Sequence, residues 1–391
     1  IREEGRKGRI GAHLIAVVAE GPHGRLYLSP TPDQIGAANV PRPEIDEDGQ
    51  IATNPRWFSP PAYGLTKFSE LFTNRQLVAM TTLSDLVAEV REQVMVDAVI
   101  AGMPEGDHLQ AGGSDAQAYA DAVATYSALG VSRTVDYSNA MCSWHSGRDT
   151  IRNIFSRQAI PMVWDYAEAN PFSSSSGNFL GQLNWVSKVL EHATVDAAGV
   201  ATQITASERA YDGLAISTDP PYYDNIGYSD LSDFFYSWLR RSLQDIYPQV
   251  VSTILTPKND ELVANPYRHD GKDGARRFFI DGFNSVFHRI RQGALPDVPM
   301  TVYYAYKQQD AAVDGTSSTG WHTLLDGLIE AGWGITATWP MRSELANRML
   351  SQGTNALASS IVLACRPRPA DADSITRRLF VARLKSELPE A

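Results

Sequence analysis

Four residues that follow a short apolar run, 213–217, carry the most distinctive chemistry of the chain: Asp219-Pro220-Pro221-Tyr222. The two prolines fix consecutive φ angles, supply no N–H donors and favour an extended conformation in the residues before them. The main-chain carbonyls therefore point outward as acceptors, beside a carboxylate and an aromatic ring. We call residues 219–222 the hook. It suits a planar ligand whose exocyclic amine donates to Asp219 and to the Pro220 carbonyl while Tyr222 stacks on the ring.

Methyl transfer to the exocyclic amine of a flipped-out nucleobase is a reaction that this hook suits. The lone pair of such an amine is delocalised into the ring, and two acceptors on its hydrogens pull the nitrogen toward tetrahedral geometry. Catalysis then consists mainly of placing the amine in line with a methyl donor. The alternative is a rigid structural turn, because Pro-Pro pairs are common in loops. The order acid-Pro-Pro-aromatic between an apolar strand and a long helix favours methyl transfer.

Four further residues are candidates for contact with a base or with DNA. Tyr223, Asn225 and Tyr228 extend the hook, and they are positioned to stack on bases or to pair with them. Lys307 follows the predicted strand 300–306 and could bind a phosphate. Each of the four also fits an ordinary loop or strand end, so both interpretations stay open.

The second half of the chain alternates apolar strands with helices of 3.6-residue periodicity. This alternation is typical of a mainly parallel sheet with helices on both faces, in which ligands bind outside the carboxyl ends of the strands. The hook lies at such a strand end. The predicted strands are 200–206, 213–217, 300–306, 334–340 and 359–367, and the predicted helices are 178–192, 229–246, 274–292 and 319–332.

The first half of the chain has a different pattern. Two strands, 13–19 and 25–29, precede a Pro-rich linker, and helical periodicity follows at 71–100, 116–130 and 148–158. We therefore predict four segments: a β-hairpin with its linker (1–62), a helical segment (63–158), the α/β domain that carries the hook (159–369), and a C-terminal helix or tail (370–391).

Composition excludes several classes of protein. The chain is 43% hydrophobic and 20% charged, which is typical of globular proteins. No apolar run approaches the roughly 18 residues of a membrane span. The only cysteines, Cys142 and Cys365, cannot build a disulfide framework or a four-cysteine zinc site, so we expect no metal and a cytoplasmic location. The net charge of −11 argues against a wholly basic surface but permits a local basic patch.

Around the hook the chain resembles the amino-methyltransferases that act on DNA adenine, whose fourth motif is Asp-Pro-Pro-Tyr. More specifically, TDPPYYDNIGYSDLSDFFYSWLRR is similar to the large adenine-specific DNA methylases that contain the domain of unknown function 1156, which often accompany anti-phage defence genes. Further similar segments are ELFTNRQLVAMTTLSDLV, FSRQAIPMVWDYAEANPF and LTPKNDELVANPYRHDGK. The resemblance covers essentially the whole chain.

This resemblance implies a Rossmann-like class I fold that uses S-adenosylmethionine to methylate the N6 amine of adenine in DNA, within a restriction-modification or anti-phage system. The family sheet order would be 3-2-1-4-5-7-6, of which the chain supplies strands 4-5-7-6 behind a helical N-terminal extension. It corresponds to the C-terminal part of such a protein. The main cofactor-binding motif and the zinc ribbon are then expected before residue 1, and other subunits of a defence system are possible partners beside DNA.

A second candidate for cofactor contact is the stretch Asn170-Pro171-Phe172, which is followed by four serines and Gly177. It echoes the family's Asp-Pro-Phe-x-Gly-x-Gly loop, with serines where glycines would let the backbone approach the cofactor. Asn170, Phe172 and Gly177, together with Asp219, are thus the candidate cofactor-binding residues. The alternative is a polar loop beside the pocket, because too few residues separate this stretch from the hook for a complete cofactor half.

Other functions remain compatible with the same residues. A hook with asparagine in the acid position is used on glutamine side chains, and one with serine favours the N4 amine of cytosine, so methylation of another planar amine or amide is an alternative. A third hypothesis is a non-catalytic module that binds nucleic acid or a partner subunit.

Overall fold

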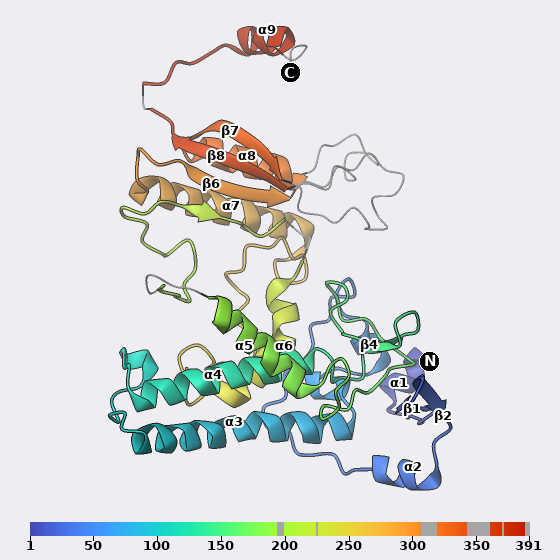
Figure 1. Cartoon of the computed structure of the whole chain (residues 1–391). Helices are drawn as coiled ribbons and strands as arrows, with labels where there is room; N and C mark the ends of the chain where they lie inside the picture. The colour runs from blue at the N-terminus through green and yellow to red at the C-terminus, as the bar shows by residue number, and fades with distance from the viewer. Residues whose placement is uncertain (194–198, 224–225, 306–318, 342–359, 370, 388–391) are drawn as a thin grey trace. The chain divides into compact units, whose positions relative to one another are not determined.

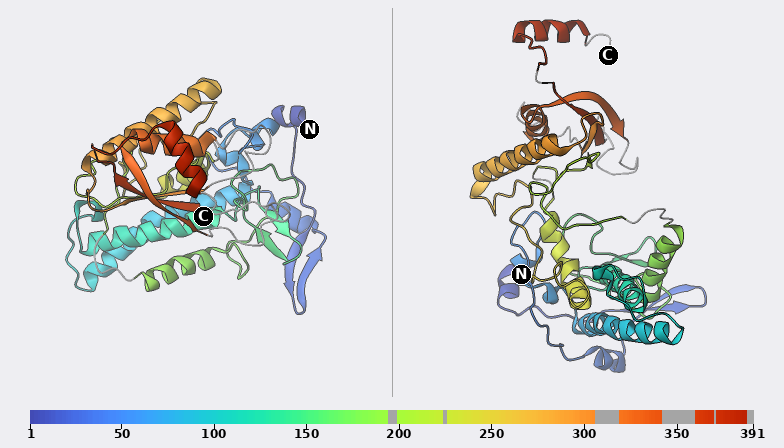
Figure 2. Two further views of the ribbon diagram at one scale, coloured as in Figure 1. Left: turned by 90° about the horizontal axis from the view of Figure 1, so that it is seen from above. Right: turned by 90° about the vertical axis from the view of Figure 1, so that its left-hand side faces the viewer.

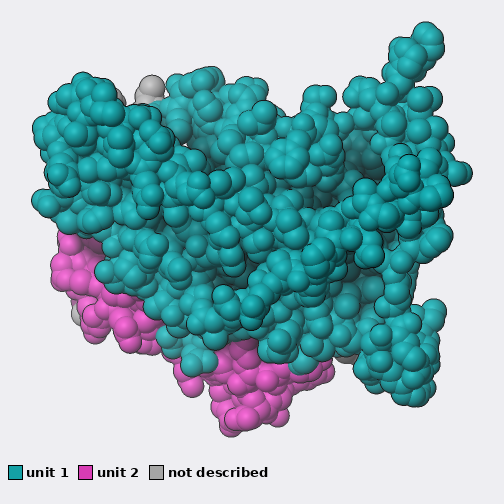
Figure 3. All heavy atoms as spheres, turned by 90° about the horizontal axis from the view of Figure 1, so that it is seen from below, with its two compact units in different colours: residues 1–203, 226–261 teal, residues 204–225, 262–391 magenta. Residues whose placement is uncertain are grey.

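The computed structural model describes the chain except residues 194–198, 224–225, 306–318, 342–359, 370 and 388–391 (Figure 1). The described part is mixed α/β, with long helices and small sheets. It divides into two compact units, coloured separately in Figure 3. Unit 1 comprises residues 1–203 and 226–261, and unit 2 comprises residues 204–225 and 262–391. The four segments predicted from the sequence stay a prediction, since a division by compactness does not test them.

Unit 1 is built on a group of packed helices. Helix α4 lies beside α3, α5 and α6, and Figures 1 and 2 both show α3 and α4 running side by side. The elements of unit 1 are α1 (Arg2–Arg6), β1 (Val17–Gly21), β2 (Gly24–Leu28), α2 (Pro32–Ala38), η1 (Pro60–Tyr63), η2 (Phe68–Leu71), α3 (Asn74–Ile100), η3 (Leu109–Ala111), α4 (Ala116–Val135), β3 (Ser143–His145), β4 (Thr150–Arg152), α5 (Phe179–His192) and α6 (Tyr228–Leu243). The predicted helices at 71–100, 116–130, 178–192 and 229–246 are thus confirmed.

The core of unit 1 is centred on an aromatic cluster at α6. Phe234 is fully buried, and its ring stacks against Phe72 with centroids 5.7 Å apart. Trp238, one turn later, meets Phe72 edge to face at 5.2 Å. Leu77 and Met80 of α3 belong to the same cluster. One face of α6 therefore joins α3 and the segment before it to a single core.

Unit 2 contains a four-stranded sheet in the order β5-β6-β8-β7. The pair β5–β6 is parallel, whereas β8 is antiparallel to both β6 and β7. Strands β5, β6 and β7 therefore run in the same direction, and β8 alone is reversed. The direction of most described strands agrees with the predicted mainly parallel sheet, although both pairings of β8 are antiparallel. The elements of unit 2 are β5 (Ser217–Thr218), α7 (Gly271–Gly293), β6 (Met300–Ala305), α8 (Thr319–Glu330), β7 (Trp333–Met341), β8 (Ser360–Pro367) and α9 (Arg377–Glu387).

Alternate residues of β6 explain how the sheet of unit 2 meets its helices. Met300, Val302 and Tyr304 are buried in one cluster with Phe279 of α7 and Leu324 of α8. Because side chains alternate between the two faces of a strand, these three positions share a face. Helices α7 and α8 contact each other over this core, and Figure 2 shows α7 lying along the sheet.

The structure corrects three predictions about local elements. Residues 148–158 form no helix: β4 pairs with β3 there, and the turn between them has Asp149 at a left-handed φ of 48°. The helix was predicted because Ile151 and Ile154 are three residues apart, as on one helix face. Both residues are indeed buried, but they reach the core from a hairpin strand and from the loop after it. No strand exists at 200–206, all of which the structure describes. The strand predicted at 213–217 is reduced to Ser217–Thr218.

At the N-terminus the predicted hairpin is confirmed as β1 and β2, with Val17 opposite Leu28. The linker that follows contains a short helix, α2, that the sequence prediction missed. Its signal was present: the Thr31 hydroxyl accepts from the Gln34 N–H while the Gln34 side chain accepts from the Thr31 N–H, which is a capping box. No helix in the described part of the chain is long and apolar enough to span a bilayer.

Candidate functional site

The hook begins immediately after β5, at the carboxyl end of the strand. Residues 213–218 run beside residues 293–302, where the Leu214 carbonyl accepts from Leu295 N–H (3.2 Å) and the Ile216 carbonyl from Thr301 N–H (3.0 Å). The intervening segment contains two prolines that offer no N–H, so a regular ladder forms only at Ser217 and Thr218. This explains why the strand is shorter than predicted. The position at a strand end was predicted correctly.

Within the hook, the acid and the aromatic residue contact each other. The Tyr222 hydroxyl donates to Asp219 Oδ1 over 3.1 Å. Asp219 is exposed, whereas Pro220, Pro221 and Tyr222 are half-buried. The hydrogen bond orients the carboxylate, and the exposed side of Asp219 is accessible to a ligand. Tyr222 thus positions the acid in addition to offering its ring.

An aromatic platform supports the hook from within unit 2. Tyr222 meets Tyr304 of β6 edge to face, with centroids 5.2 Å apart, and Tyr304 lies 5.9 Å from Trp321 of α8. The next residue, Tyr223, packs edge to face against Phe279 of α7 at 5.0 Å. We use the name platform for these five residues. The sequence prediction missed Tyr304, Trp321 and Phe279, because only the packing of β6, α7 and α8 brings them to the hook.

A second segment lies against the hook through the main chain. The Tyr223 carbonyl accepts from Ala264 N–H over 2.7 Å, and Ala264 is buried. The residues that follow form a turn in which the side chain of buried Asn265 accepts from Tyr267 N–H (3.0 Å). Tyr267 is exposed beyond this turn. Residues 265–267 read Asn-Pro-Tyr and share proline and tyrosine with the hook. This similarity could have marked the segment as a neighbour of the hook from the sequence alone.

The other predicted contact residues differ in what the structure describes of them. The ring of Tyr223 packs into the core of unit 2, as described above. Tyr228 is the first residue of α6 in unit 1 and is 43% exposed. Asn225 and Lys307 lie outside the described residues. Their roles, and that of Tyr228, stay predictions.

The candidate cofactor loop lies in unit 1, in the turn before α5. The Asn170 side chain accepts from Phe172 N–H (3.0 Å), and Phe172 is exposed. Gly177 has φ +88° and is buried against Tyr137, where a Cβ would come within 2.9 Å of the Tyr137 Cβ. These contacts explain the glycine by its conformation and packing. The assignment of Asn170, Phe172 and Gly177 to a cofactor stays a prediction.

A buried polar network fixes the first turns of α6, the helix that follows the hook in sequence. Asp233 accepts from Lys258 Nζ (2.8 Å) and from Thr256 N–H (2.8 Å), while Glu261 accepts from Ser229 N–H (2.8 Å). The segment 256–261 is thereby held to the helix. No sequence motif marks these residues. The only signal for the contact between segment 256–261 and α6 was that acidic side chains and hydroxyl groups can form hydrogen bonds with each other.

Comparisons with known proteins identify no relative. No family model matches the chain, and neither a curated protein nor a solved structure is significantly similar to it. The class that the fold defines is a mixed α/β protein, and the interpretation of the hook rests on its own residues and their surroundings.

The platform predicts a mutational effect at Gly320 in α8. A Cβ there would lie 2.9 Å from the Tyr304 hydroxyl and 3.0 Å from the Tyr223 Cβ, so Gly320→Ala must displace the platform. A matched control in the same helix is Gly327→Ala, whose Cβ would crowd the end of the Asn284 side chain at 2.8 Å and make an ordinary contact with Phe287 at 3.8 Å. We expect Gly320→Ala to be less stable than Gly327→Ala by about 1–2 kcal/mol in urea denaturation. Equal stability of the two variants would contradict the rigidity of the platform.

Proposed function

We propose that the chain contributes the base-binding part of an S-adenosylmethionine-dependent DNA adenine N6-methyltransferase. The observation that carries this proposal is the hook itself: an exposed carboxylate follows a strand end, with two prolines and a tyrosine braced by the platform. A flipped adenine would donate its amine hydrogens to Asp219 and to the Pro220 carbonyl. Stacking on an aromatic ring is worth about 1–3 kcal/mol per base, which suits the role of Tyr222.

The sheet of unit 2 supports the same proposal. Its order β5-β6-β8-β7, with β5 parallel to β6 and β8 antiparallel to both its neighbours, agrees with the order 4-5-7-6 implied by the resemblance. In that correspondence β5 is the strand that ends at the base-binding motif. Several enzyme classes share the same sheet order. The order therefore supports the proposed function only in combination with the hook.

The fit to the cofactor is incomplete within the described residues. Bound S-adenosylmethionine would supply the methyl group, and its usual site in this class is a strand followed by a glycine-lined turn and a helix. The turn at Asn170–Gly177 precedes a helix, but the residues before it make only isolated bridges, Phe58 with Ile160 and Ser143 with Tyr166. The proposal therefore assigns the amine-binding residues and no step through the cofactor.

Binding of single-stranded DNA tests whether the hook recognises the amine. Two fluorescent oligonucleotides are compared by anisotropy: a thymine tract with one adenine, and the same tract with purine, which lacks the 6-amine. We expect adenine to bind about tenfold more tightly, since a hydrogen bond to a charged group contributes roughly 1.5–3 kcal/mol. Asp219→Ala should remove this preference, and Tyr222→Ala should weaken both oligonucleotides. Asp212→Ala, which changes an exposed acid in the turn that precedes this segment, is the matched control.

Three outcomes distinguish the proposal from its alternatives. Equal binding of adenine and purine by the unaltered chain would contradict amine recognition. With methyl-labelled S-adenosylmethionine and unmethylated DNA, product analysis that finds N4-methylcytosine or labelled protein glutamine would favour the other methyltransferases. DNA binding that neither Asp219→Ala nor Tyr222→Ala alters, without methyl transfer, would favour a non-catalytic nucleic-acid-binding module.

A further inference from the structure

Helix α9 carries positive charge in a chain that is acidic as a whole. Its sequence, RRLFVARLKSE, contains four basic residues and one acidic residue, whereas the net charge of the chain is −11. The basic residues are Arg377, Arg378, Arg383 and Lys385. The helix begins after Thr376, whose hydroxyl accepts from Leu379 N–H (3.4 Å). The local basic patch that the composition permits is therefore present on this helix.

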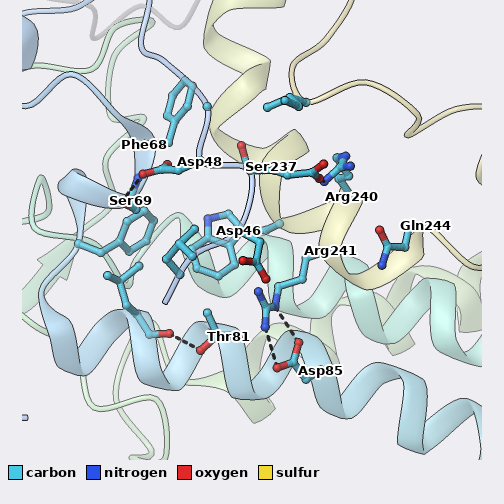
Figure 4. Close-up of a pocket in the computed structure, with 17 residues that line it drawn as sticks. Asp46, Asp48, Phe68, Ser69, Thr81, Asp85, Ser237, Arg240, Arg241 and Gln244 are labelled. Carbon is cyan, nitrogen blue, oxygen red and sulfur yellow. Dashed lines mark hydrogen bonds and ion pairs between the residues drawn. The ribbon is translucent and has the colours of Figure 1, made fainter. Parts of the chain in front are cut away.

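The four cations of α9 have no partner within the described part of the chain. Each side chain is exposed, and none donates a hydrogen bond to a described residue or forms an ion pair with one. An arginine of unit 1 shows the contrast. In the pocket of Figure 4, Arg241 makes a two-pronged ion pair with Asp85, with Nε–Oδ1 at 2.7 Å and Nη2–Oδ2 at 2.8 Å. The positive charge of α9 is thus available to a ligand.

Packing within the described part of the chain leaves α9 open. The side chains of residues 377–386 are all exposed, and the exposed fractions of Leu379, Phe380 and Leu384 are 59%, 52% and 45%. Isolated helices shorter than about 12–15 residues are marginal in water, and most helices in proteins are stabilised by tertiary packing. Because α9 has only 11 residues, a partner that binds one of its sides would stabilise it.

Helical geometry places two of the cations on one side of α9. Seven residues complete nearly two turns, so Arg378 and Lys385 lie on the same side, about 10 Å apart along the axis. Ala382 lies between them, and its small side chain lets a partner approach the helix closely. Arg383 lies on the opposite side, one turn after Leu379. We call Arg378, Ala382 and Lys385 the basic face.

The spacing and surroundings of these cations discriminate between classes of partner. A small anion could bind only one of two cations that lie about 10 Å apart. Double-stranded DNA carries one negative charge per about 1.7 Å of its axis, so it offers phosphates to both. A membrane surface fits less well, because an interfacial helix needs a continuous apolar face. On the apolar side of α9, Arg383 lies between Leu379 and Phe380.

The hook does not supply affinity for a DNA backbone. Asp219 is an exposed carboxylate and the chain as a whole carries a net charge of −11, so both repel phosphates. Contacts between cations and phosphates supply essentially all of non-specific DNA binding. A chain that recognises adenine through the hook therefore requires cations elsewhere, and the unpaired cations of α9 meet this requirement.

We propose that the basic face of α9 binds DNA, with Arg378 and Lys385 each contacting one phosphate. This inference rests on the proposed function for its choice of DNA as the partner. It assigns to α9 a contact that is independent of base sequence, whereas the hook discriminates between bases. The two contacts can therefore be tested separately, the first by its dependence on salt and the second by the preference for adenine over purine.

Anisotropy of a fluorescent DNA duplex, titrated with the full chain between about 50 and 200 mM salt, tests the basic face. The measured quantity is the slope of the logarithm of the binding constant against the logarithm of salt concentration, to which one phosphate contact contributes about 1. We expect Arg378→Gln/Lys385→Gln to weaken binding and to reduce this slope by about 2, on duplexes with adenine or with purine alike.

Two control variants separate the basic face from charge in general. Arg383→Gln removes a cation from the opposite side of the same helix and should leave the slope unchanged. Lys7→Gln/Arg9→Gln removes the same net charge as the double variant of α9, from side chains already paired with Glu3 and Glu4, and should also leave the slope unchanged. Thermal unfolding of the α9 variants should match that of the unaltered chain, because the substituted side chains are exposed and unpaired.

Specific results would overturn the basic face. A slope that Arg378→Gln/Lys385→Gln leaves unaltered would refute the contact, while a preference for adenine in the same experiment would leave the hook standing. If that preference is absent but the double variant reduces the slope as expected, the hook fails and the α9 contact stands. Absence of duplex binding at the lowest salt, or an equal reduction by Arg383→Gln, would also refute the basic face. Binding to phosphatidylglycerol vesicles that the double variant abolishes, with the DNA slope unaltered, would show a membrane-binding helix instead.

Discussion

Phe234→Ala is expected to lower the free energy of unfolding by about 4 kcal/mol, because large-to-small changes at fully buried phenylalanines cost roughly 3–5 kcal/mol. The exposed fraction of Phe234 is 0%. Its ring meets four others, with centroid distances of 6.5, 5.7, 5.6 and 5.2 Å to Phe68, Phe72, Phe155 and Phe235. The substitution removes the shared partner of these rings, so the cavity that it leaves cannot be filled by the movement of one side chain. Urea denaturation of the full chain, followed by circular dichroism, measures the loss.

The matched control for Phe234→Ala is Phe172→Ala. Phe172 is 78% exposed, and an exposed substitution of this kind changes stability by about 0.5 kcal/mol or less. If both variants lost the same stability, or if Phe234→Ala lost less than about 1 kcal/mol, the aromatic cluster at α6 would not be the centre of the core of unit 1.

Helical periodicity predicted this part of the fold well. Phe234, Phe235 and Trp238 have the spacing of one helix face, and in the structure Phe234 and Trp238 are buried and Phe235 packs against them. The helices α3 and α4 were found from the same signal. In each case a local pattern suffices, because a helix that buries one face must repeat its apolar residues at 3.6-residue spacing.

Local patterns failed where tertiary contacts decide the structure. Residues 150–154 have apolar spacing suited to a helix, yet Asp136 accepts hydrogen bonds from Asn153 Nδ2 (2.8 Å) and Phe155 N–H (3.4 Å) and holds the segment extended beside α4. The assignment of residues 226–261 to unit 1, between two parts of unit 2, is equally invisible in a local window. It depends on the burial of Phe234 against residues far earlier in the chain.

The residues of the candidate site also divide into those that could be predicted from the sequence and those that could not. The hook was predictable, because its carboxylate, prolines and tyrosine are adjacent in sequence and follow an apolar run. The platform residue Tyr304 and the backbone partner Ala264 were not, since each comes to the hook only through the folding of unit 2.

A buried ion-pair network lies at the end of the α3–α4 hairpin, where residues from different elements also meet. A substitution in this network is expected to have the second large effect on the free energy of unfolding. The side chain of Asp121 is 1% exposed. It accepts from Arg91 Nε (2.7 Å), from Leu109 N–H (3.0 Å) and from His108 Nδ1 (3.1 Å). One carboxylate thus joins α3, α4 and the loop between them. An uncharged side chain at this position would leave Arg91 without its counter-ion.

Asp121→Asn is expected to lower the free energy of unfolding at pH 7 by about 3 kcal/mol, since breaking a buried ion pair on one side costs roughly 3–5 kcal/mol and Arg91 is partly exposed. Asp97→Asn changes an exposed acid of α3 that accepts from Gln93 Nε2 (2.8 Å), and it should cost less than about 0.5 kcal/mol. Burial alone would raise the pKa of Asp121, but the hydrogen bonds from Leu109, Arg91 and His108 together lower it below its ordinary value of 3.8. A lowered pKa in the folded state means that the carboxylate stabilises the fold above its unfolded pKa, and that this stabilisation is lost as the pH falls through the folded pKa. The difference in unfolding free energy between the unaltered chain and Asp121→Asn should therefore shrink below about pH 4, and a difference that stays constant to pH 2.5 would contradict the assigned role of the carboxylate.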